Sequence, residues 1–527
     1  MAALAASPLL AACSSIPGAP PLGPSDALTV GAFQEPDTLD PNATGLALSS
    51  FIASQIYDPL MWWLPTGNGG YEFVPGLAES YEVSSDGTAF TFHLRKDVTF
   101  HDGTKFDATA VQATFDHIVD PATKSRSAIG SLGPYKETKI LDQYTAQVVF
   151  KAPNAAFVHE MGTVLFGMTS PTALKKYGPT GIGNHPVGTG PFRFVSFTPQ
   201  NQVALERNPG YRWGPRTFGM TGPAKLKTLT FKILTDTTAQ YNALLAGQIQ
   251  MAMNLATNEI FSLEKSSAFR YLNVPSTGQP YGYPINVAKA PTDELAVRQA
   301  ILHAVNQDQL VKTVLDGAYQ SAHYLLTPTT LGYSESASSM YPYDPAKARS
   351  LLESAGWKVG SGGVRQKNGQ QLHLDILIQS SNGFDLPTQF IAYELGNVGF
   401  STSISDQPFT TAAASYNKGV QNLSAIFYYD VDPYFLLSLT GCNDIQSGFN
   451  WAHYCQPSND AAWEQVNTVI DQAKRDQKLQ SITTKLMEQA IFLPLYNVSG
   501  VYSIVKNLVG LHFNPTGYAL FHTARLV

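Results

Sequence analysis

The segment Ala78–Gly103 constrains the fold of this chain most, because it reads as two extended runs separated by a charged turn. Phe90, Phe92 and Leu94 alternate with polar residues, which is the period of a half-buried strand. The second run ends at Asp102-Gly103, where glycine readily accepts a positive φ. The segment therefore predicts a strand with one face packed on a core.

Capping residues predict helices elsewhere in the chain. Asp107 stands before an apolar stripe at helical spacing, and Asp344, Pro345 and Gly356 mark the two ends of another helix. Residues 461–490 carry apolar side chains at helical spacing over a longer stretch. Because strands and helices alternate without a fixed repeat, we expect a mixed α/β chain.

Size and composition narrow the possible functions. A chain of 527 residues is too long for one simple core and predicts about three units. The net charge is −6 and basic residues form no run, which argues against a nucleic-acid partner. The sequence also lacks an apolar stretch of about 18 residues, the length that a membrane-spanning helix needs.

The order of positions in Ala78–Gly103 resembles the signature of the extracellular solute-binding proteins of peptide-type ABC importers. The resemblance covers the chain from about Leu28 to the last strands. It implies an α/β, two-lobed periplasmic-binding-protein fold of class II type, with an extra inserted domain and a hinged ligand cleft. Further blocks keep the order of that family: 186–192, 205–211, 243–249, 297–301 and 343–357.

The resemblance also implies a domain organisation. Domain I is expected from residues 28–57, 185–285 and 500–527, domain II from the insertion 58–184, and domain III from 286–499. Residues 1–27 would form a signal segment, a lipobox and a flexible spacer. We expect the hinge near Pro284–Asn286 and Val498–Gly500.

The N-terminal segment predicts export. Leu10-Ala11-Ala12-Cys13 resembles the cleavage site of bacterial lipoproteins and is followed by a spacer rich in Pro and Gly. No Lys or Arg precedes Cys13, which an incomplete start would explain. We expect a periplasmic or cell-surface protein, anchored to the membrane by lipid on Cys13; the alternative is an Ala-rich tail with an incidental cysteine.

The remaining cysteines, Cys442 and Cys455, flank a short loop. In an oxidising compartment such a pair most often forms a disulfide, which would restrain the loop by roughly 3 kcal/mol. Two free buried thiols are the alternative. A zinc site is not expected, because neither cysteine has a CxxC partner and only His453 is close in sequence.

Motifs of common enzyme classes fail at specific positions. The glycine pair Gly162 and Gly167 is followed by Met168 where a phosphate loop needs lysine. His159-Glu160 lacks the second histidine of a metalloprotease helix, since Thr occupies position 163. We predict no enzyme, no cofactor and no metal, and keep a secreted hydrolase with a spatially assembled triad as the alternative from another class.

The resemblance implies that an extended ligand lies between domains I and III, where it pairs with the backbone as an added strand. In the family an Asp commonly meets the ligand's α-ammonium group. Asp430 precedes Pro433 by three positions, one fewer than in the usual peptide-binding arrangement, and Tyr429 stands where that Asp would align. Asp430 therefore has two open interpretations, an ammonium contact or a turn cap, and Asp432 beside Pro433 is the better cap.

The candidate ligand residues are these acids together with aromatic and polar side chains. For the aromatic side chains the alternative role is core packing, and for Glu35 it is an exposed turn. The candidates are Phe33, Gln34, Glu35, Tyr57, Tyr281, Tyr283, Asn286, Tyr428, Tyr429, Asp430, Asp432 and Trp451.

The expected mechanism is hinge closure. The ligand would be a peptide, with an oligosaccharide or another small solute as the alternative, and its contacts with both lobes would stabilise the closed form. Only that form would dock productively on the permease subunits of the ABC transporter. We expect a monomer.

Overall fold

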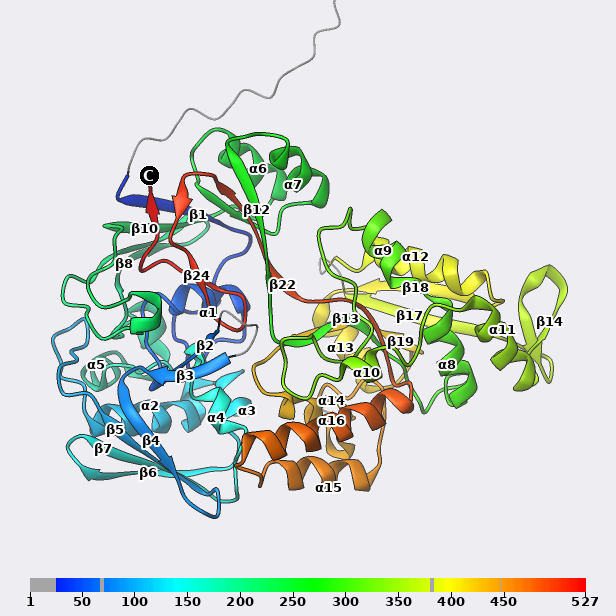
Figure 1. The fold of residues 1–527 in the computed structure, drawn as a ribbon, viewed down its shortest axis with the longest axis horizontal. Coiled ribbons are helices and arrows are strands. Elements are labelled where there is room, and N and C mark those ends of the chain that lie inside the picture. The colour runs from blue at the N-terminus through cyan, green and yellow to red at the C-terminus, as the bar shows by residue number, and fades with distance from the viewer. Residues whose placement is uncertain (1–24, 67–70, 380–382, 447) are drawn as a thin grey trace, which may run out of the picture.

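The computed structural model describes residues 25–66, 71–379, 383–446 and 448–527. Cys13 lies outside the described residues. Two lobes lie side by side, with the N-terminal half of the chain mainly in one lobe and residues from about 278 to 496 in the other (Figure 1). Buried apolar side chains of the described residues form three clusters, two in the first lobe and one in the second.

The first cluster of the first lobe packs against a mixed sheet with the strand order β12-β22-β11-β1-β10-β9-β8. β1 pairs in parallel with both β10 and β11, and the other ladders are antiparallel. The elements here are β1 (Ala27–Ala32), α1 (Ala47–Ala53), β8 (Phe192–Thr198), β9 (Gln202–Arg207), β10 (Thr228–Ile233), α6 (Thr237–Leu245), β11 (Met251–Met253), α7 (Thr257–Glu264), β12 (Phe269–Pro275), β22 (Ser499–Val505), β23 (Leu508–Val509), β24 (His512–Phe513), β25 (Ala519–Leu520) and β26 (Arg525–Leu526).

The second cluster of the first lobe is built on an antiparallel sheet of order β4-β5-β7-β6. The alternation in the sequence correctly predicted its central strand β5, in which Phe90, Phe92 and Leu94 are buried. Asp107 caps α2 by accepting from the Thr109 amide, as expected. The elements are β2 (Met61–Pro65), β3 (Tyr71–Pro75), β4 (Ala78–Val83), β5 (Ala89–Leu94), α2 (Ala108–Val119), α3 (Ala128–Leu132), β6 (Tyr135–Asp142), β7 (Thr145–Phe150), α4 (Phe157–Glu160) and α5 (Pro171–Gly181).

The second lobe contains a parallel sheet of order β18-β17-β19 and an antiparallel sheet of order β20-β13-β21. The predicted helix at Asp344 is confirmed as α11, with Asp344 as its N-cap and Gly356 at φ +91° after its end. The elements are β13 (Gly278–Pro284), α8 (Leu295–Ala304), α9 (Gln307–Thr313), α10 (Glu335–Ser338), α11 (Pro345–Ser354), β14 (Lys358–Val359), β15 (Arg365–Lys367), β16 (Gln370–Gln371), β17 (His373–Gln379), α12 (Asp385–Gly396), β18 (Ser401–Gln407), α13 (Phe409–Asn417), β19 (Leu423–Ser424), β20 (Ile426–Tyr429), α14 (Leu436–Thr440), α15 (Pro457–Val466), α16 (Gln472–Glu488) and β21 (Phe492–Tyr496).

The chain crosses between the lobes at two adjacent places. β12 ends at Pro275 in the first lobe and β13 begins at Gly278 in the second, so this crossing lies before the predicted position near Pro284–Asn286. The return crossing joins β21 to β22 at Asn497–Val498, beside the predicted Val498–Gly500. Gly278 is required at the first crossing, because its φ is +130° and a Cβ there would lie 2.0 Å from the Tyr428 carbonyl oxygen.

Within the part of the chain that the structure describes, helices of sufficient length and apolarity to span a bilayer are absent.

Candidate ligand site at the junction of the lobes

Tyrosines from both lobes gather beside the two crossings. In the second lobe the Tyr281 and Tyr496 rings stack with centroids 4.5 Å apart, and the Tyr319 ring lies 5.1 Å from that of Tyr496. A hydrogen bond joins the hydroxyls of Tyr281 and Tyr429, and Tyr429 interacts electrostatically with tyrosines of the first lobe. We call this set the tyrosine cluster: Tyr281, Tyr319, Tyr429, Tyr496, Tyr502 and Tyr518.

The hydroxyls of the tyrosine cluster are uncharged at physiological pH. Burial raises the pKa of Tyr281 and Tyr429 well above the ordinary value, and it raises that of Tyr319 to about 12. Tyr281, Tyr319 and Tyr429 nevertheless remain partly exposed. Apolar rings with neutral polar tips suit a ligand that has both apolar and hydrogen-bonding groups.

Two cavities adjoin the crossings and share Gln320. The larger measures about 390 Å³, within the range of small-molecule sites, and has Tyr319 in its wall. Its lining residues are Asp308, Val311, Lys312, Asp316, Gly317, Tyr319, Gln320 and Ser321. The smaller measures about 70 Å³ and lies between the crossing segments at Ser276 and Asn497–Ser499. The two cavities thus meet at Gln320, whose carbonyl accepts from the Asn497 amide at the return crossing.

Asp432 joins the lobes through a buried ionic network. Its carboxylate accepts from Arg475 Nη1 at 2.6 Å and Nη2 at 2.7 Å, and from His159 Nδ1 of the first lobe at 2.8 Å. Asp432 Oδ1 also accepts from the Tyr434 amide at 2.9 Å. The side chain is thus both the expected turn cap and an ion-pair partner, and it is only 1% exposed.

The network fixes the protonation of its members. Burial alone would raise the pKa of Asp432, but the Arg475 guanidinium and the His159 ring hold it well below its usual range. Burial lowers the pKa of His159, so its imidazole is neutral at pH 7 and donates Nδ1–H to Asp432. The network therefore pairs one anion with one cation.

Asp430 lies two residues away and has a different environment. Its Oδ1 accepts from the amides of Val431 at 2.7 Å and Asp432 at 3.2 Å, and its side chain is hydrogen-bonded to Glu160 of α4. Burial raises the pKa of Asp430 to about 6. Burial and the neighbouring Asp430 raise that of Glu160 as well. Asp430 remains partly exposed, next to the partly exposed Tyr428 and Tyr429, so it has an accessible side.

Several sequence-predicted ligand residues are placed away from any accessible surface. Tyr57 is 1% exposed in the core of the first lobe, and Tyr283 is 0% exposed with its hydroxyl bonded to Thr388. Core packing, the alternative for both aromatic residues, accounts for their positions. Asp432 is closed off in the same way by its own partners.

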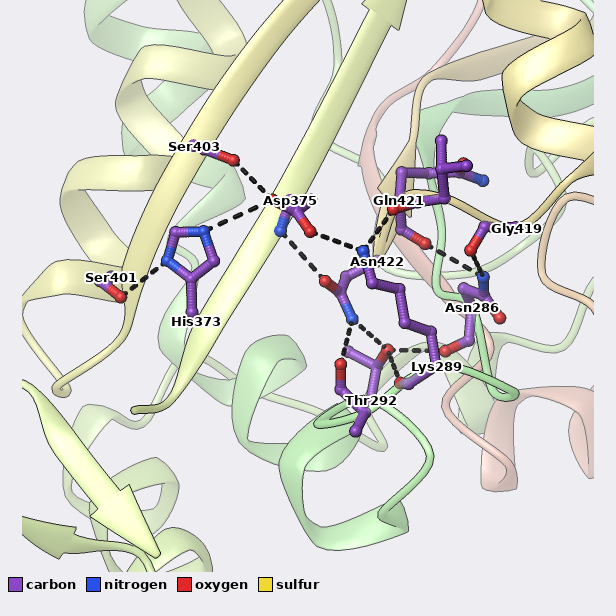
Figure 2. Close-up of polar contacts among 12 residues, drawn as sticks. Asn286, Lys289, Thr292, His373, Asp375, Ser401, Ser403, Gly419, Gln421 and Asn422 are labelled. Atoms are coloured by element: carbon purple, nitrogen blue, oxygen red, sulfur yellow. Dashed lines mark hydrogen bonds and ion pairs between the residues drawn. The ribbon is translucent and has the colours of Figure 1, made fainter. Parts of the chain in front are cut away.

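Asn286 is also occupied internally, as Figure 2 shows. Its amide donates to the carbonyls of Gly419 and Gln421, and its Oδ1 accepts from the Ala288 amide. The neighbouring Lys289 bonds Asp375 of β17. This polar network fixes the segment after β13 to the parallel sheet, and we leave Asn286 out of the site.

The structure joins Cys442 and Cys455 by a disulfide. The enclosed loop presents Phe449 to Tyr428, with ring centroids 6.2 Å apart. Trp451 in the same loop is 1% exposed and donates its indole N–H to Asn417, so it supports the loop rather than facing a ligand.

The predicted residues after β1 form a separate group. Phe33 packs on the core of the first lobe, and Glu35 accepts from the Gln200 amide in the turn between β8 and β9. Phe33, Gln34 and Glu35 are all partly exposed. Phe33 and Glu35 thus contact residues of their own lobe.

Sequence reasoning missed Glu160 and four members of the tyrosine cluster, Tyr319, Tyr496, Tyr502 and Tyr518. Glu160 was considered only as part of an incomplete metalloprotease motif, and the four tyrosines were not identified as candidates. A carboxylate within the apolar run 155–168 was the available signal for Glu160, because a buried acid requires a partner.

Comparison with known proteins decides the family. A model of bacterial extracellular solute-binding proteins, family 5 (middle region), matches residues 72–447, which is most of the chain. The chain belongs to this family. Its members are binding proteins of ABC importers and not enzymes, so the hydrolase alternative is set aside.

Relatives and solved structures match over nearly the whole chain. The glutathione-binding protein GsiB of Pectobacterium atrosepticum is 28% identical over 501 residues, 93% of this chain and 92% of that protein. The periplasmic binding protein DppA of Helicobacter pylori, solved with the peptide STSA, has a TM-score of 0.76 at 23% identity and covers 95% of this chain and 98% of its own. NikA of Brucella suis, solved with Fe(III)-EDTA, has a TM-score of 0.83 at 23% identity and covers 94% and 99%. The two structures confirm the predicted periplasmic-binding-protein fold.

Proposed function

We propose that this solute-binding protein captures a peptide or peptide-like solute with a free amino group at the junction of its lobes and presents it to the permease of an ABC importer. The observation that carries the proposal is Asp430, a partly exposed residue whose carboxyl group lies beside the neutral tyrosine cluster. A carboxylate in such surroundings favours a cationic group, and the rings offer area for the rest of the ligand. Glutathione, named for the GsiB relatives, and the peptide held by DppA both carry a free amino group.

Closure follows from contacts made by both lobes. A ligand between Asp430 and the partly exposed first-lobe residue Tyr518 would stabilise the closed form over the open one. We propose the domains that the sequence predicts, except that the boundary between the first domain and the third lies at the crossing 276–277 and not at 285–286. The first domain then comprises 28–57, 185–275 and 500–527, the second 58–184, and the third 278–499. We propose that the protein acts as a monomer.

The ligand class is tested by mass spectrometry of small molecules released from the purified protein. We expect retained peptides or peptide-like solutes with a free amino group. Release of oligosaccharides instead would move the proposal to an uncharged ligand, for which the tyrosine cluster is also suited.

We propose lipid attachment at Cys13, which rests on the sequence alone. The test is expression with the native upstream region followed by cell fractionation and N-terminal mass analysis. A lipid-modified Cys13 in the membrane fraction is expected, and an unmodified N-terminus in the soluble fraction would refute the anchor.

A further inference from the structure

The two lobes also meet at α4, away from the crossings. Figure 1 shows α3 and α4 of the first lobe beside the start of α16 in the second. The Ala155 amide donates to the Asn467 carbonyl at 2.8 Å, and the Ala156 amide donates to Asn467 Oδ1 at 2.9 Å. His159 then reaches Asp432. These bonds fix the adjacent Glu160 of one lobe against Asp430 of the other.

Three acids lie at this contact, and within the described ranges only Asp432 has a cationic partner. Asp432 has Arg475 on both oxygens and His159 on one. Among the residues that the structure describes, Glu160 and Asp430 have hydrogen bonds with each other, with the Ser131 hydroxyl and with two backbone amides, none of which is cationic. Because Arg475 is engaged by Asp432, the part of the chain that the structure describes provides no cationic partner for the Glu160–Asp430 pair itself.

Two hydrogen-bonded carboxyl groups require a proton between them. The titratable and charged groups that surround the pair are His159 on α4, Asp432 on the same loop, Arg475 on α16 and Tyr428 on β20. His159 is neutral, Asp432 is balanced by Arg475 and Tyr428 is uncharged, so these groups supply no cation to the pair. One carboxyl therefore keeps its proton at neutral pH.

We propose that Glu160 and Asp430 form an ammonium clamp shared by the two lobes, in which the ligand's ammonium group replaces the proton held between the carboxyl groups. The inference rests on the proposed function and deepens it by adding Glu160 as a specificity residue. No covalent bond forms. The pair passes one proton to the solvent, becomes doubly ionised, and accepts hydrogen bonds from the ammonium group, so the total charge is unchanged.

The position of the pair supports this exchange. Asp430 is partly exposed beside Tyr428, whereas Glu160 is 4% exposed behind it. A ligand can approach Asp430 from the accessible side, and a buried, newly ionised Glu160 needs the positive charge that the ammonium group brings. Since one carboxylate belongs to each lobe, the same group that binds also holds the lobes together.

Proton release during binding tests the clamp. Calorimetric titration with glutathione and with tetra-alanine at pH 7, in phosphate and in Tris buffer, gives the number of protons released from the dependence of the heat on the buffer. We expect about one proton per bound molecule for the wild type and about none for Glu160→Gln, whose amide donates to Asp430 without a proton to lose. Glu394→Gln is the matched control, because burial also raises the pKa of Glu394 but its partner is Tyr343, and it should match the wild type. Binding by the wild type with buffer-independent heat would overturn the clamp while leaving the proposed function intact.

A second measurement needs no ligand. The raised pKa of the pair means that the folded protein keeps a proton that the unfolded chain loses above about pH 4.3, so this contribution to stability is lost as pH rises toward the folded value. Between pH 5 and pH 8 the wild-type Tm should fall more than that of Glu160→Gln, because the variant pair has no shared proton to lose. Equal pH slopes for wild type and Glu160→Gln would exclude the shared proton. If neither glutathione nor tetra-alanine binds, the proposed function fails. The pH dependence of Tm still decides whether Glu160 and Asp430 share a proton.

Discussion

At the scale of single residues, the neighbouring acids Asp430 and Asp432 have different roles. Asp432 is closed off by Arg475, His159 and the Tyr434 amide, whereas Asp430 keeps an accessible side. The sequence predicted a turn role for Asp432 from the adjacent Pro433, and this is confirmed. Its ion pair could not be foreseen, because Arg475 and His159 are distant in sequence.

Replacing Asp432 by Asn should destabilise the protein by about 3–5 kcal/mol, because it leaves the buried Arg475 guanidinium without its anion. The free energy of unfolding from urea denaturation measures this. Lys227→Gln is the control, since Lys227 and Asp26 form an exposed ion pair whose loss should change stability little. A loss for Asp432→Asn no larger than for the control would contradict the buried network.

Replacing Asp430 by Asn should weaken binding of a free-amino peptide by about tenfold or more, because the charged partner of the ammonium group is lost. The Asn side-chain oxygen can still accept from the Val431 and Asp432 amides, so the Tm should change little. Calorimetric titration with unfolding of the same samples separates the two effects. Unchanged affinity in a folded variant would count against Asp430 as a ligand residue.

At the scale of elements, the loop between Cys442 and Cys455 is held by its disulfide. It holds Phe449 against Tyr428 and Trp451 against Tyr416. The double substitution Cys442→Ser with Cys455→Ser should lower the free energy of unfolding by about 3 kcal/mol, since the unfolded chain regains the freedom of that loop. Intact mass without reductant establishes the bond in the wild type, and denaturation of both proteins gives the difference. Alkylation of both thiols in unreduced protein would show that the bond is absent.

Local signals predicted the elements that local chemistry determines. The alternation around Phe92 and the caps Asp107 and Asp344 specify β5, α2 and α11 correctly, because period and cap lie within each element. Residues 461–490 kept one helical spacing, yet the structure divides them into α15 and α16. Asn467 lies in this break and binds residues of the other lobe, a partner that no local pattern encodes.

The candidate site was predicted less well for the same reason. Asp430, Tyr281 and Tyr429 stay candidates from the sequence, whereas Trp451 and Asn286 have buried structural roles. Glu160 meets Asp430 only through the folded chain. Contacts between side chains of different lobes could thus be identified only from the structure.

At the scale of the whole molecule, the lobes touch at the crossings, at α4 and where Thr257 of α7 donates to Asp316. Asn467→Ala should weaken ligand binding by about three- to tenfold, because it removes a hydrogen bond that exists only while the lobes are together. The affinity for a free peptide and the affinity for its N-acetylated form should fall by the same factor. Asn459→Ala is the control, since Asn459 bonds Thr440 within the second lobe, and an equal loss in both variants would argue against an effect on closure.

The central claim is that the protein closes on a solute through its amino group. The most direct measurement is calorimetric titration of the wild type with the tightest binder from a tetrapeptide library and with the N-acetylated form of that peptide. Acetylation removes the positive charge, so the acetylated peptide should bind at least about tenfold more weakly. Equal affinity for the two forms would contradict amino-group recognition and favour an uncharged solute.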